Sequence, residues 1–276
     1  MKNISKPWKK IAATWQNITS PSRPSEGELE VFESKIKSKL KHGSRVLILG
    51  STPEFRIMLS KYPSKVFLID VNWEMTLAMT EIAAKIDPDK EVWVKSSWTE
   101  DVFLQNHFDV ILGDFTFGNL SFADQNKFFT NVCKCLKEDG LYLERVLMFI
   151  ESLPVLNYQD LLRYFSPANQ SYSNAALLWS MGIFLMDNFN KDRQVKVSDF
   201  LDLLKSKDTS GELRKIIDFG NKPLWPNDKS WFIMEKNNLF KKIQAYFKIL
   251  EVVSEKQVNY PKIYKEMIPI LVMKKL

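Results

Sequence analysis

The sequence predicts an α/β protein with a doubly wound, mostly parallel sheet of seven strands, a helical segment before it and a helical insertion within it. Short, continuous apolar runs at residues 45–50, 65–70, 91–95, 107–114 and 141–149 alternate with stretches of helix length. This alternation is typical of βαβ units, whose strands are covered on both faces. Two further β-rich runs, 245–255 and 267–276, close the chain and predict an antiparallel pair at the sheet edge.

Residues 1–44 are predicted to form a helical lid over the sheet. Trp8 and Trp15 belong to an apolar pattern with helical spacing, and the stretch SPSRPS at 20–25 predicts a stiff, extended link. Ser25 and Glu28 have the spacing of a capping box before a helix with one apolar face. Two tryptophans on a solvated tail would be costly, so we expect this segment to be packed.

Residues 45–150 are predicted to form the ligand-binding core. Helix starts are indicated by Pro53 in the first turn after the first strand, by Asn72 after the second and by Ser121 after the fourth. The dipeptide Asp87-Pro88 ends one helix, and residues 138–140 (EDG) predict a turn into the fifth strand.

Residues 151–240 interrupt the alternation and are predicted to be a helical insertion. Apolar patterns of helical period occur at 172–188, 200–204 and 213–219, joined by polar loops. Residues 241–276 then supply the terminal strand pair that completes the core.

The composition argues against a secreted, a membrane-spanning and a metal-binding protein. The first residues contain no apolar segment of signal-peptide type, and no later stretch reaches the ~20 apolar residues of a membrane span. Cys133 and Cys135 point in different directions on a predicted helix, and His42 and His107 are the only histidines. We therefore expect a cytoplasmic protein without a metal site.

The net charge of +6 leaves two interpretations open. Most of the basic residues are lysines near the two ends of the chain, on segments that also carry glutamates. A solvated, lysine-rich surface is one interpretation, and an acidic partner such as RNA is the other. Arginines interleaved with aromatic residues are expected of an RNA-binding surface, and arginines are few here.

The first strand and its turn, VLILGSTPE (46–54), indicate the ligand. Gly50 permits close approach of a ligand, but the second and third glycines of a dinucleotide fingerprint are absent. Glu54 falls in the first turn of the helix that begins near Pro53. A carboxylate there repels a pyrophosphate and suits a ligand with an ammonium group.

Other polar residues follow the remaining strands. Asp70 ends the second strand twenty residues after the glycine, where a carboxylate can accept hydrogen bonds from a ribose diol, or else cap the next helix. Ser97 and Trp98 follow the third strand and could hold an adenine, although Trp98 could equally pack in the core. Asp114 and Phe115 end the fourth strand on the same rim; the alternative for Asp114 is that it only caps a turn.

Residues 26–150 and the final strand pair resemble the class I S-adenosylmethionine-dependent methyltransferases, which have a Rossmann-like fold. The resemblance implies S-adenosylmethionine as cofactor. It also implies a set of cofactor-binding residues: Gly50, Ser51 and Thr52 at the methionine part, Asp70 at the ribose, Val71, Asn72, Ser97 and Trp98 at the adenine, and Asp114 and Phe115 at the methyl-donor pocket. Two positions depart from the family pattern, since Ile48 replaces an acidic residue and Ser97 replaces an aspartate.

The resemblance also implies transfer of a methyl group to an oxygen or nitrogen atom. Asp114 is the residue we expect to act as base, and Glu144 lies near the end of the fifth strand as well. No asparagine-proline-proline-tyrosine run follows Asp114. Arg23 is predicted to pair with the carboxylate of the cofactor.

Aromatic residues of the lid and the insertion predict an enclosed pocket for a small-molecule acceptor. The candidates for its walls are Trp8, Trp15, Arg23, Tyr172, Trp179, Trp225 and Trp231, each of which ordinary packing would also explain. An RNA methyltransferase and a non-catalytic S-adenosylmethionine-binding protein are the alternatives. A nicotinamide-dependent dehydrogenase fits the turn at Gly50 less well.

Overall fold

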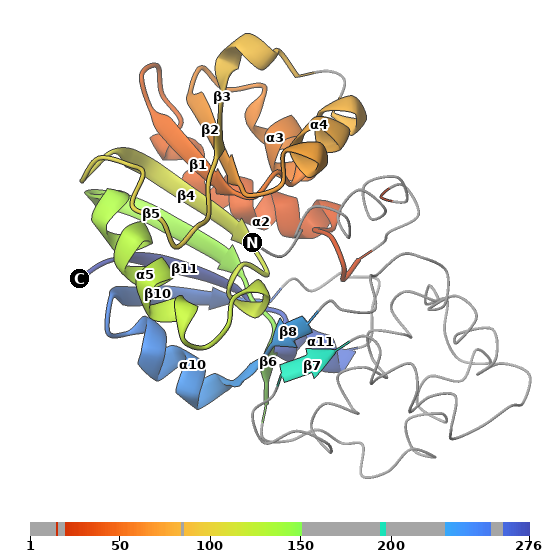
Figure 1. Ribbon diagram of the computed structural model, residues 1–276, viewed down its shortest axis with the longest axis vertical. Coiled ribbons are helices and arrows are strands. Elements are labelled where there is room, and N and C mark those ends of the chain that lie inside the picture. The colour runs from red at the N-terminus through yellow and green to blue at the C-terminus, as the bar shows by residue number, and fades with distance from the viewer. Residues whose placement is uncertain (1–14, 16–19, 84–85, 151–193, 197–229, 255–261) are drawn as a thin grey trace, which may run out of the picture.

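The computed structural model describes residues 15, 20–83, 86–150, 194–196, 230–254 and 262–276, and a seven-stranded sheet runs through them (Figure 1). The strand order is β10-β11-β5-β4-β1-β2-β3. The strands are β1 (Arg45–Leu49), β2 (Lys65–Asp70), β3 (Glu91–Lys95), β4 (Phe108–Asp114), β5 (Leu136–Arg145), β10 (Phe247–Val253) and β11 (Ile270–Lys275). All neighbours from β5 to β3 are parallel, and β11 is antiparallel to both β5 and β10. The predicted doubly wound, mostly parallel sheet is confirmed, and its order reverses between β1 and β4.

The described helices begin largely where the sequence indicated. They are α2 (Glu26–Ile36), α3 (Pro53–Leu59), α4 (Trp73–Ile82), α5 (Asp124–Cys135), α10 (Lys236–Ile243) and α11 (Lys262–Met267), with 3₁₀ turns η2 (Lys37–Lys39), η3 (Pro88–Lys90) and η4 (Phe117–Asn119). Ser25 and Glu28 form both bonds of the capping box at the start of α2. Asn72 caps α4 by accepting a hydrogen bond from Met75 N at 3.2 Å.

Each face of the sheet buries its own apolar layer. The side chains of β1 alternate, so that Val46 and Ile48 face α2 and α3 while Leu47 and Leu49 face α5. Phe32 of α2 and Phe55 of α3 lie edge to face with ring centroids 4.7 Å apart. Because both faces are covered, the apolar runs of β1 and its neighbours are continuous rather than alternating.

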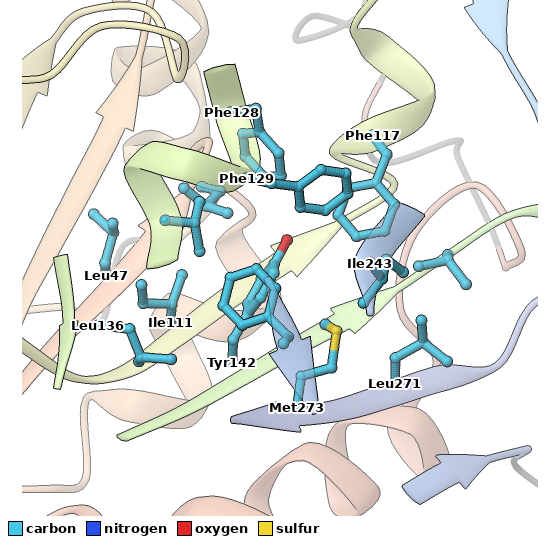
Figure 2. Packing of buried hydrophobic residues seen from close by; sticks show 14 of the residues in the cluster. Leu47, Ile111, Phe117, Phe128, Phe129, Leu136, Tyr142, Ile243, Leu271 and Met273 are labelled. Atoms are coloured by element: carbon cyan, nitrogen blue, oxygen red, sulfur yellow. The ribbon is translucent and has the colours of Figure 1, made fainter. Parts of the chain in front are cut away.

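The layer on the α5 side is rich in aromatic residues. Phe128 and Phe129 of α5 lie close to Phe117, and Tyr142 of β5 lies beneath them (Figure 2). Ile243 of α10 is fully buried in the same cluster. The terminal segment therefore contributes to the main core, and this anchors the antiparallel strand pair to the rest of the sheet.

The fifth strand begins earlier than the apolar run predicts. Leu136 pairs with Phe108 directly after α5, and the next pairing is Leu141 with Val110. The predicted turn at residues 138–140 is therefore a bulge inside β5. Gly140 lies in this bulge, where a Cβ would lie 2.7 Å from Leu136 Cδ1 and 3.0 Å from Lys137 O, so a larger residue would displace the leucine side chain. The strand stops at Arg145, and 148–149 form the separate strand β6 (Met148–Phe149).

The described part of 151–240 contains strands as well as the start of a helix. β7 (Gln194–Lys196) pairs with β8 (Ser230–Phe232), and β9 (Met234–Glu235) pairs with β6. The predicted helices at 172–188, 200–204 and 213–219 lie outside the described residues. None of the helices in the described ranges has both the length and the apolar character that crossing a bilayer requires.

Candidate functional site

The carboxyl ends of β1, β2 and β3 are tied together by backbone hydrogen bonds. Gly50 N donates to Ile69 O at 2.9 Å, and Ser96 N donates to Asp70 O at 3.2 Å. Gly50 has φ +109°, a conformation that glycine adopts without strain. The residues at and after the carboxyl ends of these strands, which the sequence indicated as ligand-binding turns, therefore lie side by side. We call this edge of the sheet the rim.

The Trp98 side chain lies beside Gly50, beneath the turns at the ends of β1 and β2. Its indole Nε1 donates to Ile69 O at 2.9 Å, and a Cβ added to Gly50 would lie 3.8 Å from its ring. The ring also packs against the apolar layer under α5. Trp98 thus serves core packing and borders the site at the same time, so the two interpretations of this residue are compatible.

Asp70 and Asn72 have separate roles at the end of β2. Asp70 Oδ1 accepts a hydrogen bond from Asn72 N at 2.8 Å, while the Asn72 side chain caps α4. The alternative that Asp70 itself caps the helix is therefore wrong. Val71 between them is 42% exposed, which leaves an apolar surface at the rim beside the Asp70 carboxylate.

The serines and threonines of the rim make local contacts. Ser97 Oγ accepts a hydrogen bond from Thr99 N at 3.2 Å and lies 2.8 Å from Thr99 Oγ1. Ser51 is buried, and Thr52 precedes α3 without a side-chain capping bond. The first turn of α3 is capped by neither hydroxyl.

Glu54 is a functional candidate whose charge, but not its partners, could be considered from the sequence. Trp15 Nε1 donates to Glu54 Oε1 at 3.3 Å, and Arg23 Nη1 lies 3.6 Å from the same oxygen. Glu54 Oε2 is buried and has no hydrogen-bond partner in the described residues. Burial raises the pKa of the Glu54 carboxyl, and Arg23 and Trp15 oppose that rise. A buried carboxylate oxygen without a partner is costly and is typical of a ligand site.

Asp114 belongs to a buried ionic network that the sequence did not reveal. Arg145 Nε donates to Asp114 Oδ1 at 2.7 Å, and Arg145 Nη1 donates to both carboxylate oxygens of Glu28 at 3.2 and 3.0 Å. Burial raises the pKa of Asp114, and the Arg145 guanidinium opposes part of the rise. The signal in the sequence was a charged pair, ER, inside the apolar run LYLERVLMF.

Phe115 has a strained backbone at the same place. Its φ is +54°, which is rare for an aromatic residue, and its ring lies 4.4 Å from Arg145 Cζ. Asn119 Nδ2 donates to Phe115 O at 2.9 Å and helps to hold the turn. Strain of this kind persists where the surroundings fix it, and it gathers at functional sites.

Glu144 is buried on the opposite face of the sheet. Thr116 N donates to Glu144 Oε1 at 2.6 Å, and Tyr142 Oη donates to Oε2 at 2.8 Å. Burial raises the pKa of Glu144 to about 8, against the lowering effect of these hydrogen bonds. Gly113 is required here, since a Cβ would lie 1.6 Å from Glu144 Oε2. Glu144 therefore anchors the turn after β4 and does not reach the rim.

A small apolar hollow of about 20 Å³, which has room for about one water molecule, lies beyond the ends of β4 and β5. It is bordered by Phe115, Phe117, Val146, Trp231, Phe232 and Leu239. Trp231 borders this hollow, whereas Trp15 and Arg23 lie at Glu54. Trp8, Tyr172, Trp179 and Trp225 lie outside the described residues. Within the described ranges, no three His, Cys, Asp or Glu side chains gather in a way that could hold a metal ion.

No protein-family model matches the chain, and no curated protein gives a significant match. Solved structures do match it. A Rhodobacter sphaeroides protein, described provisionally as a Zn-dependent alcohol dehydrogenase, aligns over 98% of both chains with a TM-score of 0.61 and 14% identity. A 1,6-didemethyltoxoflavin-N1-methyltransferase from Burkholderia thailandensis, solved with bound 1,6-didemethyltoxoflavin and S-adenosylhomocysteine, covers 97% of this chain and 86% of its own, with a TM-score of 0.55 and 9% identity.

A TehB-like SAM-dependent methyltransferase from Corynebacterium glutamicum aligns over 98% of both chains, with a TM-score of 0.51 and 11% identity. At such low identity these similarities concern the fold alone. The chain has the fold of the class I S-adenosylmethionine-dependent methyltransferases, as the order of its strands and the antiparallel β11 also indicate.

Proposed function

Because the chain has this fold, we propose that it is an S-adenosylmethionine-dependent methyltransferase. It would transfer the methyl group to an oxygen or nitrogen atom of a small molecule. The observation that supports this most is the acidic character of the rim at the switch point between β1 and β4. Glu54 lies in the first turn of the helix after β1, Asp114 is the last residue of β4, and Asp70 is the last residue of the neighbouring strand β2. In a doubly wound sheet this crevice is where ligands bind.

S-adenosylmethionine fits such a rim better than a nicotinamide dinucleotide does. It carries an ammonium group, a sulfonium and a ribose diol, whereas a dinucleotide brings a doubly charged pyrophosphate. The buried Glu54 Oε2 suits the ammonium group. The Asp70 carboxylate has lone pairs for both ribose hydroxyls. The dehydrogenase description of the Rhodobacter protein is therefore not the function we propose for this chain.

The remaining contacts are assigned by their position on the rim. Gly50, Ser51 and Thr52 would border the methionine part, and Val71, Asn72, Ser97 and Trp98 the adenine. Arg23, whose Nη1 lies 3.6 Å from Glu54 Oε1, would pair with the cofactor carboxylate. Phe115 would close the methyl-donor pocket.

The cofactor supplies an electrophilic methyl group, so this chain has mainly to orient the acceptor and exclude water. The hollow beyond β4 and β5 marks the proposed acceptor site, since it is lined by aromatic side chains that include Phe115. It holds only about one water molecule as it stands, so an acceptor would have to part these side chains to enter. Asp114 is the proposed base, because it ends β4 next to Phe115 and because burial raises the pKa of its carboxyl, which makes the carboxylate a better proton acceptor.

The proposal is tested by calorimetry with S-adenosylmethionine and S-adenosylhomocysteine. Asp70→Ala should weaken binding by about 2–4 kcal/mol, which is roughly 30- to 1,000-fold. Asp109→Ala is a matched control, because Asp109 also accepts a backbone N–H at 2.8 Å, from Arg45, but lies at the amino end of β4. No binding by the wild-type chain, or equal binding by the Asp70→Ala and wild-type proteins, would refute the proposal.

The acceptor class needs its own experiment. Formation of S-adenosylhomocysteine across a panel of small aromatic phenols and amines tests the small-molecule proposal. An RNA gel-shift series over increasing salt tests the RNA alternative, because phosphate contacts weaken steeply with salt. Cofactor binding without turnover on either class of acceptor would favour the non-catalytic alternative.

A further inference from the structure

Residues 20–25, here called the strap, contact Arg145 at the end of β5 and Glu54 in the first turn after β1. Pro21, Ser22 and Pro24 are buried although they belong to an irregular segment. The carbonyl oxygen of Arg23 accepts hydrogen bonds from Ser20 Oγ and from Arg145 Nη1, each at 3.1 Å. The strap is therefore fastened to the sheet from below by a side chain of β5.

The Arg145 side chain contacts four residues, two from the strap and α2 and two from the end of β4 and the turn after it. It donates to the strap at Arg23 O, to Glu28 of α2 and to Asp114 of β4, and its guanidinium lies against the Phe115 ring. The side chain is 0% exposed. A planar guanidinium can bridge partners in several directions at fixed angles, which the single ammonium of a lysine cannot do.

We propose that Arg145 is a positioning residue, which holds the strap and the turn after β4 on one guanidinium so that Arg23 and Phe115 take their places at the rim together. The inference rests on the proposed function, since it gives these two residues a ligand to contact. Arg145 itself lies beneath the rim and acts through them. Its carbonyl oxygen also accepts a hydrogen bond from Phe115 N at 2.8 Å, which fixes the strained residue from the backbone side.

The chain contains a matched control in Arg56. Arg56 is also 0% exposed at its side chain, binds both carboxylate oxygens of Glu91 at 2.9 and 2.8 Å, and lies 5.7 Å from the Trp93 ring. Glu91 begins β3, so this pair is at the opposite end of the sheet from the rim. Both arginines therefore stabilise the fold in similar ways, but only Arg145 contacts the strap.

The experiment compares Arg145→Lys with Arg56→Lys in the full chain. Both substitutions should lower the thermal midpoint. Only Arg145→Lys should weaken S-adenosylmethionine binding, by about 10-fold or more, since small displacements of positioning groups have effects of this size or larger. Only Arg145→Lys should speed amide hydrogen exchange in residues 20–25, by about 10-fold or more, because the strap opens without the core.

Two further results decide the inference. If Arg145→Lys does not fold, Glu28→Gln replaces it. The amide oxygen can still accept the capping-box bond from Ser25 N, while the amide NH₂ takes the place of the other oxygen that Arg145 contacts, so the same two effects are expected in smaller measure. Equal cofactor affinity and equal strap exchange in the Arg145 and Arg56 variants would overturn the proposal. If the wild-type chain binds no cofactor, the proposed function fails, and strap exchange alone then decides whether Arg145 fastens this segment.

Discussion

Glu54→Gln replaces a buried carboxylate by an uncharged amide of nearly the same shape, and its effects on stability and on binding should have opposite signs. Glu54 Oε2 has no partner within the described residues, so the folded chain bears the cost of burying it. The amide oxygen can still accept the hydrogen bond from Trp15 Nε1. The free energy of unfolding should therefore stay level or rise by about 1 kcal/mol, since relief of burial offsets the lost pair with Arg23.

Cofactor binding should change in the other direction. Loss of a charge-assisted hydrogen bond to the ammonium group costs about 1.5–3 kcal/mol, so S-adenosylmethionine should bind roughly 10- to 100-fold more weakly. Burial raises the pKa of Glu54, so wild-type affinity should fall as pH drops through that raised value, and the glutamine variant should lose this dependence. The assays are calorimetry over a pH series and denaturant unfolding.

Glu33→Gln is the control for this experiment. The Glu33 carboxylate is paired with Lys61 and Tyr62, away from the rim, and Lys61 lowers its pKa. Its removal should reduce stability slightly and leave cofactor affinity unchanged. A Glu54→Gln protein that is less stable, or that binds the cofactor as tightly as wild type, would show that Glu54 is an ordinary structural residue.

Three further predictions concern the turn after β4 and the lid. Burial raises the pKa of Glu144 from 4.5 to about 8, so between these pH values the folded chain binds a proton that the unfolded chain has lost. The contribution of Glu144 to the free energy of unfolding should therefore fall by about 1.4 kcal/mol for each pH unit across this range. Glu144→Gln should remove that slope in urea unfolding, and parallel slopes for the two proteins would contradict the assignment. Gly113→Ala should cost about 1–3 kcal/mol through its clash with Glu144, and less when combined with Glu144→Ala; equal costs in both backgrounds would exclude the clash. Deletion of residues 1–25 should reduce cofactor affinity and the hydrogen-exchange protection of the strand-end loops while the core stays folded, and survival of both would mean that this segment is not a lid.

The order of strands and helices could be predicted from the sequence because each element has its own local signal. Continuous apolar runs mark strands covered on both faces, and caps such as Asn72 mark the helix starts between them. Asp70 was placed at the rim for the same reason, since a residue that ends a strand lies at the edge of the sheet whatever its neighbours are. The bulge in β5 was mistaken for a turn because EDG is a turn sequence, and only its pairing with β4 keeps it within the strand.

The partners of the charged residues were decided by the tertiary structure. Arg145 and Glu28 are 117 residues apart, and Trp15 and Glu54 are 39 apart, so no local pattern connects either pair. A sequence shows that a charge lies within an apolar run, but the identity of its partner depends on which strands and helices meet, and therefore on the order of the sheet. Glu144 and Arg145 are adjacent in the chain but face opposite sides of the sheet, because side chains alternate along a strand. The layers that cover the two faces therefore decide that these neighbouring charges lie in different environments.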